Sequence, residues 1–176
     1  MVFAHDTEQA LLAAVELVNT ADDPDALRAV SDLDAFYTRW GYTGRHDHTD
    51  AELAAVREVR GPLRQLLTAP RDEAVPLVNA ILADAGAVPR LVRHDPVDWH
   101  IHAEPADAPL ATQIAVETAM AMIDVVRENE TSRLAVCADA DCEDLVLDLS
   151  RNRSKRFCST TCGNRNAVAA YRARQR

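Results

Sequence analysis

The stretch that decides the fold runs from residue 137 to residue 165 and reads CADADCEDLVLDLSRNRSKRFCSTTCGNR. It holds all four cysteines of the 176-residue chain as two short-spaced pairs, Cys137 with Cys142 and Cys158 with Cys162. Four thiolates spaced in this way suit tetrahedral zinc. Because cysteine fills all four positions and none stays open for water, we expect one structural Zn2+ ion rather than a catalytic one. Buried free thiols and two disulfides are the alternatives.

The insert between the two cysteine pairs predicts a hairpin. Apolar residues alternate along positions 145–149, which indicates a strand, residues 150–154 can turn, and residues 155–157 can return to Cys158. Residues 163–174 then have the pattern of a helix, which puts Cys162 near a helix N-terminus, where the helix dipole stabilises a thiolate. Knuckle, hairpin and helix together predict a treble-clef-like zinc module.

Three segments of this region closely resemble the CGNR zinc-finger family over residues 132–176. They are Ser150–Ser159, the string Cys162-Gly163-Asn164-Arg165, and Ala169–Arg174. Proteins of this family usually carry an N-terminal ABATE domain, and Leu17-Val18-Asn19-Thr20 is similar to the start of that domain. The resemblance implies a mainly helical N-terminal region, metal ligands at the four cysteines and a signature turn at residues 163–165. It also implies a stress-related transcription regulator, or an RNA-binding zinc-ribbon-like protein.

Charge is divided unevenly along the chain. The formal net charge is −9, but residues 151–176 hold eight basic side chains and no acidic one. The first 150 residues hold the other 11 basic residues and all 28 acidic ones, a formal charge of −17. An acidic body is unsuited to phosphate, whereas a basic tail fits nucleic acid. We therefore expect the tail to contact DNA or RNA.

Basic side chains of the tail form the expected nucleic-acid surface. On a helix beginning at residue 163, Arg165, Arg172 and Arg176 fall on one face, where planar guanidinium groups suit phosphates and guanine edges. The candidate nucleic-acid-binding residues are Arg151, Arg153, Lys155, Arg156, Arg165, Arg172 and Arg176.

Another face of that helix carries Ala167, Val168 and Tyr171, which we expect to pack on the zinc module. A solvated basic face and docking of the helix on the acidic body are alternatives to nucleic-acid contact. Another is a protein–protein interaction module stapled by zinc. For Arg165, which lies close to the zinc turn, a structural role is also open.

Residues 1–130 are expected to form a mainly α-helical domain, and residues 131–176 the zinc module. Only 5 glycines and 5% aromatic residues favour packed helices over a sheet sandwich. Apolar spacing and capping residues predict helices over roughly 7–18, 72–85 and 110–128, and one from a capping box at Thr49. A further helix is expected from an N-cap at Asp23 to Gly41, with Ser31 and Asp34 as an alternative point at which it restarts. Residues 91–93 and 99–102 predict a small β-hairpin around Asp95-Pro96.

Two pairs of histidines are weighed as metal ligands. His100 and His102 would share one face of a strand, but no third ligand is close in sequence, so we expect half-exposed hairpin histidines instead. The same expectation holds for His46 and His48, which lie in a loop.

Other functional classes lack a signal. No nucleophile elbow, phosphate-binding glycine loop or HExxH motif occurs, so no enzyme is expected. No apolar run approaches the roughly 20 residues of a membrane helix, and the N-terminus has no secretory-signal pattern. We expect a cytoplasmic protein that does not bind membranes, whose acidic body responds to a small-molecule effector or a protein partner.

Overall fold

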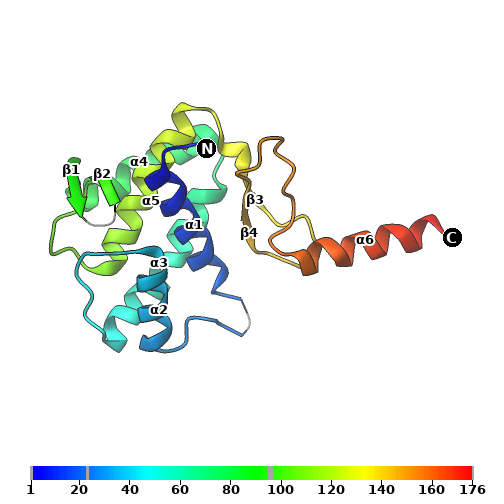
Figure 1. The fold of residues 1–176 in the computed structure, drawn as a ribbon, viewed down its shortest axis with the longest axis horizontal. Helices are drawn as coiled ribbons and strands as arrows, with labels where there is room; N and C mark the ends of the chain where they lie inside the picture. The colour runs from blue at the N-terminus through cyan, green and yellow to red at the C-terminus, as the bar shows by residue number, and fades with distance from the viewer. Residues whose placement is uncertain (1, 23, 95–96, 176) are drawn as a thin grey trace.

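A helical body and a smaller cysteine-bearing module, from which one helix projects, make up the computed structural model (Figure 1). It describes residues 2–22, 24–94 and 97–175. The body consists of α1 (His5–Asn19), α2 (Val30–Trp40), α3 (Asp50–Thr68), α4 (Arg71–Asp84), the antiparallel hairpin β1 (Arg90–His94) and β2 (Val97–His102), and α5 (Leu110–Arg127). The module consists of a single 3-10 turn (Thr131–Arg133), β3 (Leu134–Val136), β4 (Leu145–Leu147) and α6 (Thr160–Arg174). The predicted mainly α fold with a small hairpin is confirmed.

Helix α5 lies at the centre of the body and packs on α1, α3 and α4. Its apolar residues recur at helical spacing, so Leu110, Ile114 and Val125 are essentially inaccessible to solvent. Leu11 and Leu17 of α1 complete this layer with no exposed surface. Burying each such side chain contributes about 1.5–3 kcal/mol, which makes this helix layer the main source of stability of the body.

The ends of the helices follow local chemistry. The Thr49 hydroxyl accepts a hydrogen bond from the Glu52 backbone N–H at 3.2 Å, which confirms the predicted N-cap of α3. The Glu52 carboxylate does not return to Thr49 but accepts the backbone N–H groups of Asp47 and His48 at 3.0 Å. Gly41 ends α2 with a φ of +67°, a left-handed conformation that favours glycine.

The helix predicted to begin at Asp23 starts later. Asp23 itself lies outside the described residues, and α2 begins at Val30, next to the alternative start at Ser31. The reason is the Asp32 carboxylate, which accepts the backbone N–H groups of Arg28 and Ala29 at 2.8 and 2.9 Å and so caps the helix at this point. The predicted turn at Asp95-Pro96 also lies outside the described residues.

The hairpin of the C-terminal module is built differently from the prediction. Strand β4 pairs antiparallel with β3, which precedes the first cysteine, and not with residues 155–157. The strand predicted within residues 145–149 is present, and Leu145, Val146 and Leu147 are each only 2% exposed. Leu145 and Leu147 pack in the core of the body, while Val146 packs with the buried thiols of the module. This strand is therefore covered on both faces.

His46 is half-buried as a whole residue, as expected, but its side chain is more enclosed than a loop position predicts. Its ring stacks on Tyr37, with 4.5 Å between ring centroids, and its side chain is 6% exposed. The two ring nitrogens lie 2.8 Å from an Asp34 oxygen and 2.7 Å from a Glu52 oxygen. These contacts fold the loop between α2 and α3 back against both helices.

Candidate zinc centre

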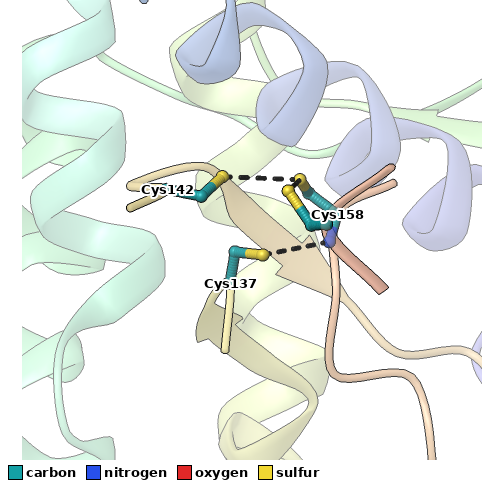
Figure 2. Close-up of side chains that lie close together, drawn as sticks. Cys137, Cys142 and Cys158 are labelled. Carbon is teal, nitrogen blue, oxygen red and sulfur yellow. Dashed lines mark hydrogen bonds between the residues drawn. The ribbon is translucent and has the colours of Figure 1, made fainter. Parts of the chain in front are cut away.

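The four cysteines come together from three segments of the module (Figure 2). Cys137 directly follows β3, and Cys142 lies in the turn that leads to β4. Within this turn, the Cys137 N–H donates to the Asp144 carbonyl oxygen at 2.8 Å, and the Cys142 N–H donates to the Asp139 carbonyl oxygen at 3.1 Å. These bonds close the chain into a knuckle that directs both sulfur atoms to the same point.

The second cysteine pair is placed by the start of α6. The Ser159 hydroxyl caps this helix by accepting the Cys162 backbone N–H at 3.3 Å, so Cys162 lies in the first turn as the sequence predicted. The positive end of the helix dipole stabilises negative charge on a thiolate there. The backbone N–H of Cys158 also donates to the Cys137 sulfur at 3.4 Å, which supports a thiolate at the other end of the site.

The sulfur positions fit one tetrahedral metal ion. The Cys158 sulfur lies 3.6 Å from the sulfur atoms of both Cys142 and Cys162, and all four sulfurs lie within 4.8 Å of one another. A zinc ion that binds four sulfurs at about 2.3 Å holds them about 3.8 Å apart. A disulfide needs about 2.05 Å, so these cysteines are free thiols and not two disulfides.

Electrostatics explain why the thiols require a cation. Burial raises the pKa of the Cys142 thiol to about 11. The pKa of the Cys158 thiol is also raised, mainly by burial and secondly by its contact with the Asp144 side chain. Several thiolates cannot ionise side by side in this pocket unless a positive ion compensates their charge. The site is thus suited to one structural zinc ion, which would be held by Cys137, Cys142, Cys158 and Cys162 with no position open for catalysis.

Acidic side chains surround the sulfur atoms. The hollow around Cys142 and Cys158 is lined by Asp22 from the body and by Asp141, Glu143 and Asp144 from the knuckle. The side-chain contact with Asp144 is the main reason that the pKa of Asp22 is raised, since the two carboxyls face each other. This face of the module is therefore negative and repels phosphate.

Arg165 of the signature turn reaches back to the knuckle. Its Nε atom lies 3.3 Å from a carboxylate oxygen of Asp139, whose side chain is only 3% exposed. The guanidinium group thus compensates a buried carboxylate next to Cys137 and Cys142. The sequence analysis left open a structural role for Arg165 beside the zinc turn. The structure places this arginine against a carboxylate of the knuckle, which is in keeping with that role.

The other candidate nucleic-acid-binding residues are distributed over two exposed segments. Arg153 donates to the Glu130 carboxylate at 2.7 Å. The remaining described members, Arg151, Lys155, Arg156 and Arg172, are exposed, and within the described part of the chain none forms an ion pair. Arg176 lies outside the described residues.

Helix α6 does not pack as predicted. Ala167, Val168 and Tyr171 are exposed, with Tyr171 at 59%, although they were expected to rest on the module. The helix extends away from both the module and the body, so the expected alternative of docking on the acidic body is not observed either (Figure 1). Helical periodicity identified an apolar face but could not reveal that no surface lies opposite it.

The firm attachment of the module to the body was not expected from the sequence. The Asn19 side chain, at the end of α1, donates to the Leu145 carbonyl oxygen at 3.0 Å and accepts the Leu145 N–H at 2.7 Å. Within the module, the Arg133 guanidinium donates to the carbonyl oxygens of Asp148 and Ser150 at 2.8 and 3.0 Å and so holds the segment after β4 on the first residues of the module. Leu134, Leu145 and Leu147 join the core of the body. The only sequence signal was Asn19 itself, a polar residue in the apolar string Leu17-Val18-Asn19-Thr20.

Comparison with known families agrees with both parts of the structure. A family model described as ABATE, putative stress-induced transcription regulator, matches residues 12–129, and one described as CGNR zinc finger matches residues 133–175. No curated protein matches the chain in sequence. Across the described residues, no helix combines the length and apolar character needed to cross a bilayer.

Proposed function

Because this chain belongs to the ABATE family and ends in a CGNR zinc finger, we propose that it is a regulator whose zinc finger binds nucleic acid. In this proposal the structural zinc fixes the base of α6, and exposed basic side chains of the finger contact phosphates. The observation that carries it is the free projection of α6, in which every residue from 167 to 175 is exposed (Figure 1).

The dimensions and charge of α6 suit a groove of a nucleic-acid duplex. Its 15 residues span about 22 Å, and the major groove of B-DNA, about 12 Å wide, admits a helix of this diameter. The helix contains no acidic residue, and Arg172 and Arg174 lie in its last turn. Arginine at these positions can neutralise phosphates or read guanine edges.

The loop before α6 supplies a second positive segment. Arg151, Lys155 and Arg156 are exposed there and lie on the chain between β4 and the capping residue Ser159. Arg153 and Arg165 are already paired with Glu130 and Asp139, so we assign them a positioning role and assign the phosphate contacts to the others. The acidic rim of the zinc centre directs nucleic acid away from the metal and toward this loop and α6.

A second candidate function rests on the exposed apolar side chains of α6. Val168 is 49% exposed and Tyr171 is 59% exposed, three residues apart on the same helix. Such a pair also suits the groove of a protein partner, which would make the finger a protein–protein interaction module stapled by zinc. The dependence of binding on salt and on nuclease separates the two functions.

For the helical body we propose a sensing role, toward a small-molecule effector or a protein partner. Its formal charge makes it a poor binder of phosphates. The division into domains at residues 130 and 131 stays a prediction, because β3 and β4 share the core of the body.

Fluorescence anisotropy with labelled duplex DNA and RNA over a salt series tests nucleic-acid binding by the full chain. We expect Arg172→Ala to weaken binding regardless of sequence and to lower the salt slope by about one. Arg39→Ala is the matched control, because Arg39 is 63% exposed and lies on the body. Zinc content is checked in each variant.

Equal affinities of the wild type and Arg172→Ala would reject α6 as the binding surface. Failure of the wild type to bind either duplex at low salt would reject nucleic-acid binding altogether. Capture of a protein partner that survives nuclease and is lost in Tyr171→Ala would support the interaction module instead.

A further inference from the structure

A cavity of about 450 Å³ opens in the helical body, away from the zinc centre. It lies between α1, the end of α2, strand β2 and α5, and its volume falls in the range of small-ligand sites. Trp40, Tyr42 and Met120 supply apolar wall, while His102 and Glu117 supply polar groups. Nothing in the proposed nucleic-acid binding uses this cavity.

Three potential metal ligands meet at its wall. The Nδ1 atom of His102 lies 2.5 Å from a carboxylate oxygen of Glu104 and 3.8 Å from a carboxylate oxygen of Glu117. One ligand atom from each residue can be chosen so that all three lie within 4.8 Å of one another. An ion bound at about 2.1 Å by three such atoms holds them about 3–3.5 Å apart. Small shifts of these side chains thus complete the geometry.

His100 orients the His102 ring for this role. The Nε2 atoms of the two histidines lie 2.9 Å apart, so one ring donates an N–H to the other. Without a metal, the Nδ1–H of His102 donates to the Glu104 carboxylate. When a metal ion displaces that proton to solvent and His102 donates its Nε2–H to His100, the Nδ1 lone pair points at the ion between the two carboxylates. A histidine that binds a metal through one nitrogen usually donates its other N–H to such a fixed partner.

The charge balance of the cluster also favours a cation. The carboxylates of Glu104 and Glu117 are 6% and 23% exposed, and the His102 imidazole is the basic group beside them. The Arg90 guanidinium donates to the Glu104 backbone carbonyl at 2.6 Å rather than to its carboxylate. Within the described part of the chain, no lysine or arginine forms an ion pair with either glutamate. Buried carboxylates are normally paired or bound to a metal.

We propose that His102, Glu104 and Glu117 bind one divalent transition-metal ion, separate from the structural zinc. One nitrogen and two carboxylate ligands suit Zn2+, Mn2+ or Fe2+. Because His102 and Glu117 line the cavity, we expect the remaining coordination positions to face it. A three-ligand site of this kind can accept water or an anionic ligand, unlike the four-cysteine centre.

Calorimetric titration of Zn2+ into full-length protein that already carries one equivalent of zinc tests this site. We expect the wild type to bind one further equivalent. His102→Ala and Glu117→Gln should each weaken this second affinity at least about 100-fold, more than the loss of an outer-shell partner does. Glu117→Gln preserves side-chain shape and removes a buried charge, so it keeps the fold, which circular dichroism verifies.

His48→Ala is the matched control, since His48 belongs to the other histidine–carboxylate cluster of the body and is 63% exposed. It should leave the second equivalent unchanged. The proposal is overturned if the wild type takes up no second equivalent of Zn2+, Mn2+ or Fe2+. It is also overturned if that equivalent persists in both His102→Ala and Glu117→Gln, or is lost in His48→Ala alone.

Discussion

Asn19→Ala should weaken the attachment of the zinc finger to the helical body more than the substitution of an exposed residue does. The side chain satisfies both backbone groups of Leu145, a residue that is 2% exposed in the middle of the interface. Removing it leaves a buried N–H and a buried C=O without partners, at about 1–3 kcal/mol each. Allowing for partial relaxation, we expect a loss of about 3 kcal/mol in the free energy of unfolding.

For a chain of this size, that loss corresponds to a decrease in Tm of about 6–12 °C. Denaturant unfolding gives the free energy, and hydrogen exchange at the Leu145 amide reports the local change. Asn79→Ala is the control, because Asn79 is an exposed asparagine on α4. Zinc content should be unchanged, since Asn19 does not touch the sulfur atoms. A loss no larger than that of Asn79→Ala, with the Leu145 amide still protected, would refute the reasoning.

Two further changes test the zinc centre and the buried acid. Cys158→Ser should abolish zinc binding at the four-cysteine centre and unfold α6 and the loop before it while helices α1–α5 persist, because a module of this size has too little core without its metal. Elemental analysis in the Glu117→Gln background and the fall in helical circular dichroism measure this. An equivalent of zinc retained in that double variant would contradict it. The pKa of Glu117 is raised from 4.5 to about 7, mainly by burial and secondly by the negative charge of the nearby Glu104 carboxylate. The folded state therefore holds the proton of Glu117 more tightly than the unfolded state does. Stability from Glu117 is therefore greatest below pH 4.5 and falls by up to about 3 kcal/mol as the pH rises past 7. Glu117→Gln should remove this decline in denaturant unfolding at a series of pH values without added metal, and an unchanged pH profile would contradict the assignment.

The zinc centre could be predicted from the sequence because its ligands are close along the chain. Two cysteine pairs and the helix after Cys162 were enough to define the site. The short strand β3 was missed, since three residues between Arg133 and Cys137 carry no clear alternation. Its pairing with β4 therefore replaced the expected pairing with residues 155–157.

Contacts between distant segments account for most of what was missed. Asn19 and Leu145 are separated by 126 residues, and no local pattern links them. Glu104 lies only two residues from His102 and was overlooked as a possible ligand. Glu117 could not be found from the sequence, because only the packing of α5 against the hairpin brings it to His102. The exposure of the apolar face of α6 was missed because helical periodicity shows which residues share a face. It does not show whether another part of the protein covers that face.

The attachment of α6 has a mechanical consequence. Among the described residues, the helix meets the rest of the molecule at its first two turns, where Cys162 lies among the sulfur atoms and Arg165 contacts Asp139. Those sulfur atoms rest on a hairpin that is part of the body's core. The helix thus acts as a lever about 22 Å long with a short, stiff pivot. A rotation of about 5° at the pivot displaces its far end by about 2 Å, more than half the rise of one base pair. Small repacking in the body near Leu145 or Leu147 would therefore be amplified at Arg172.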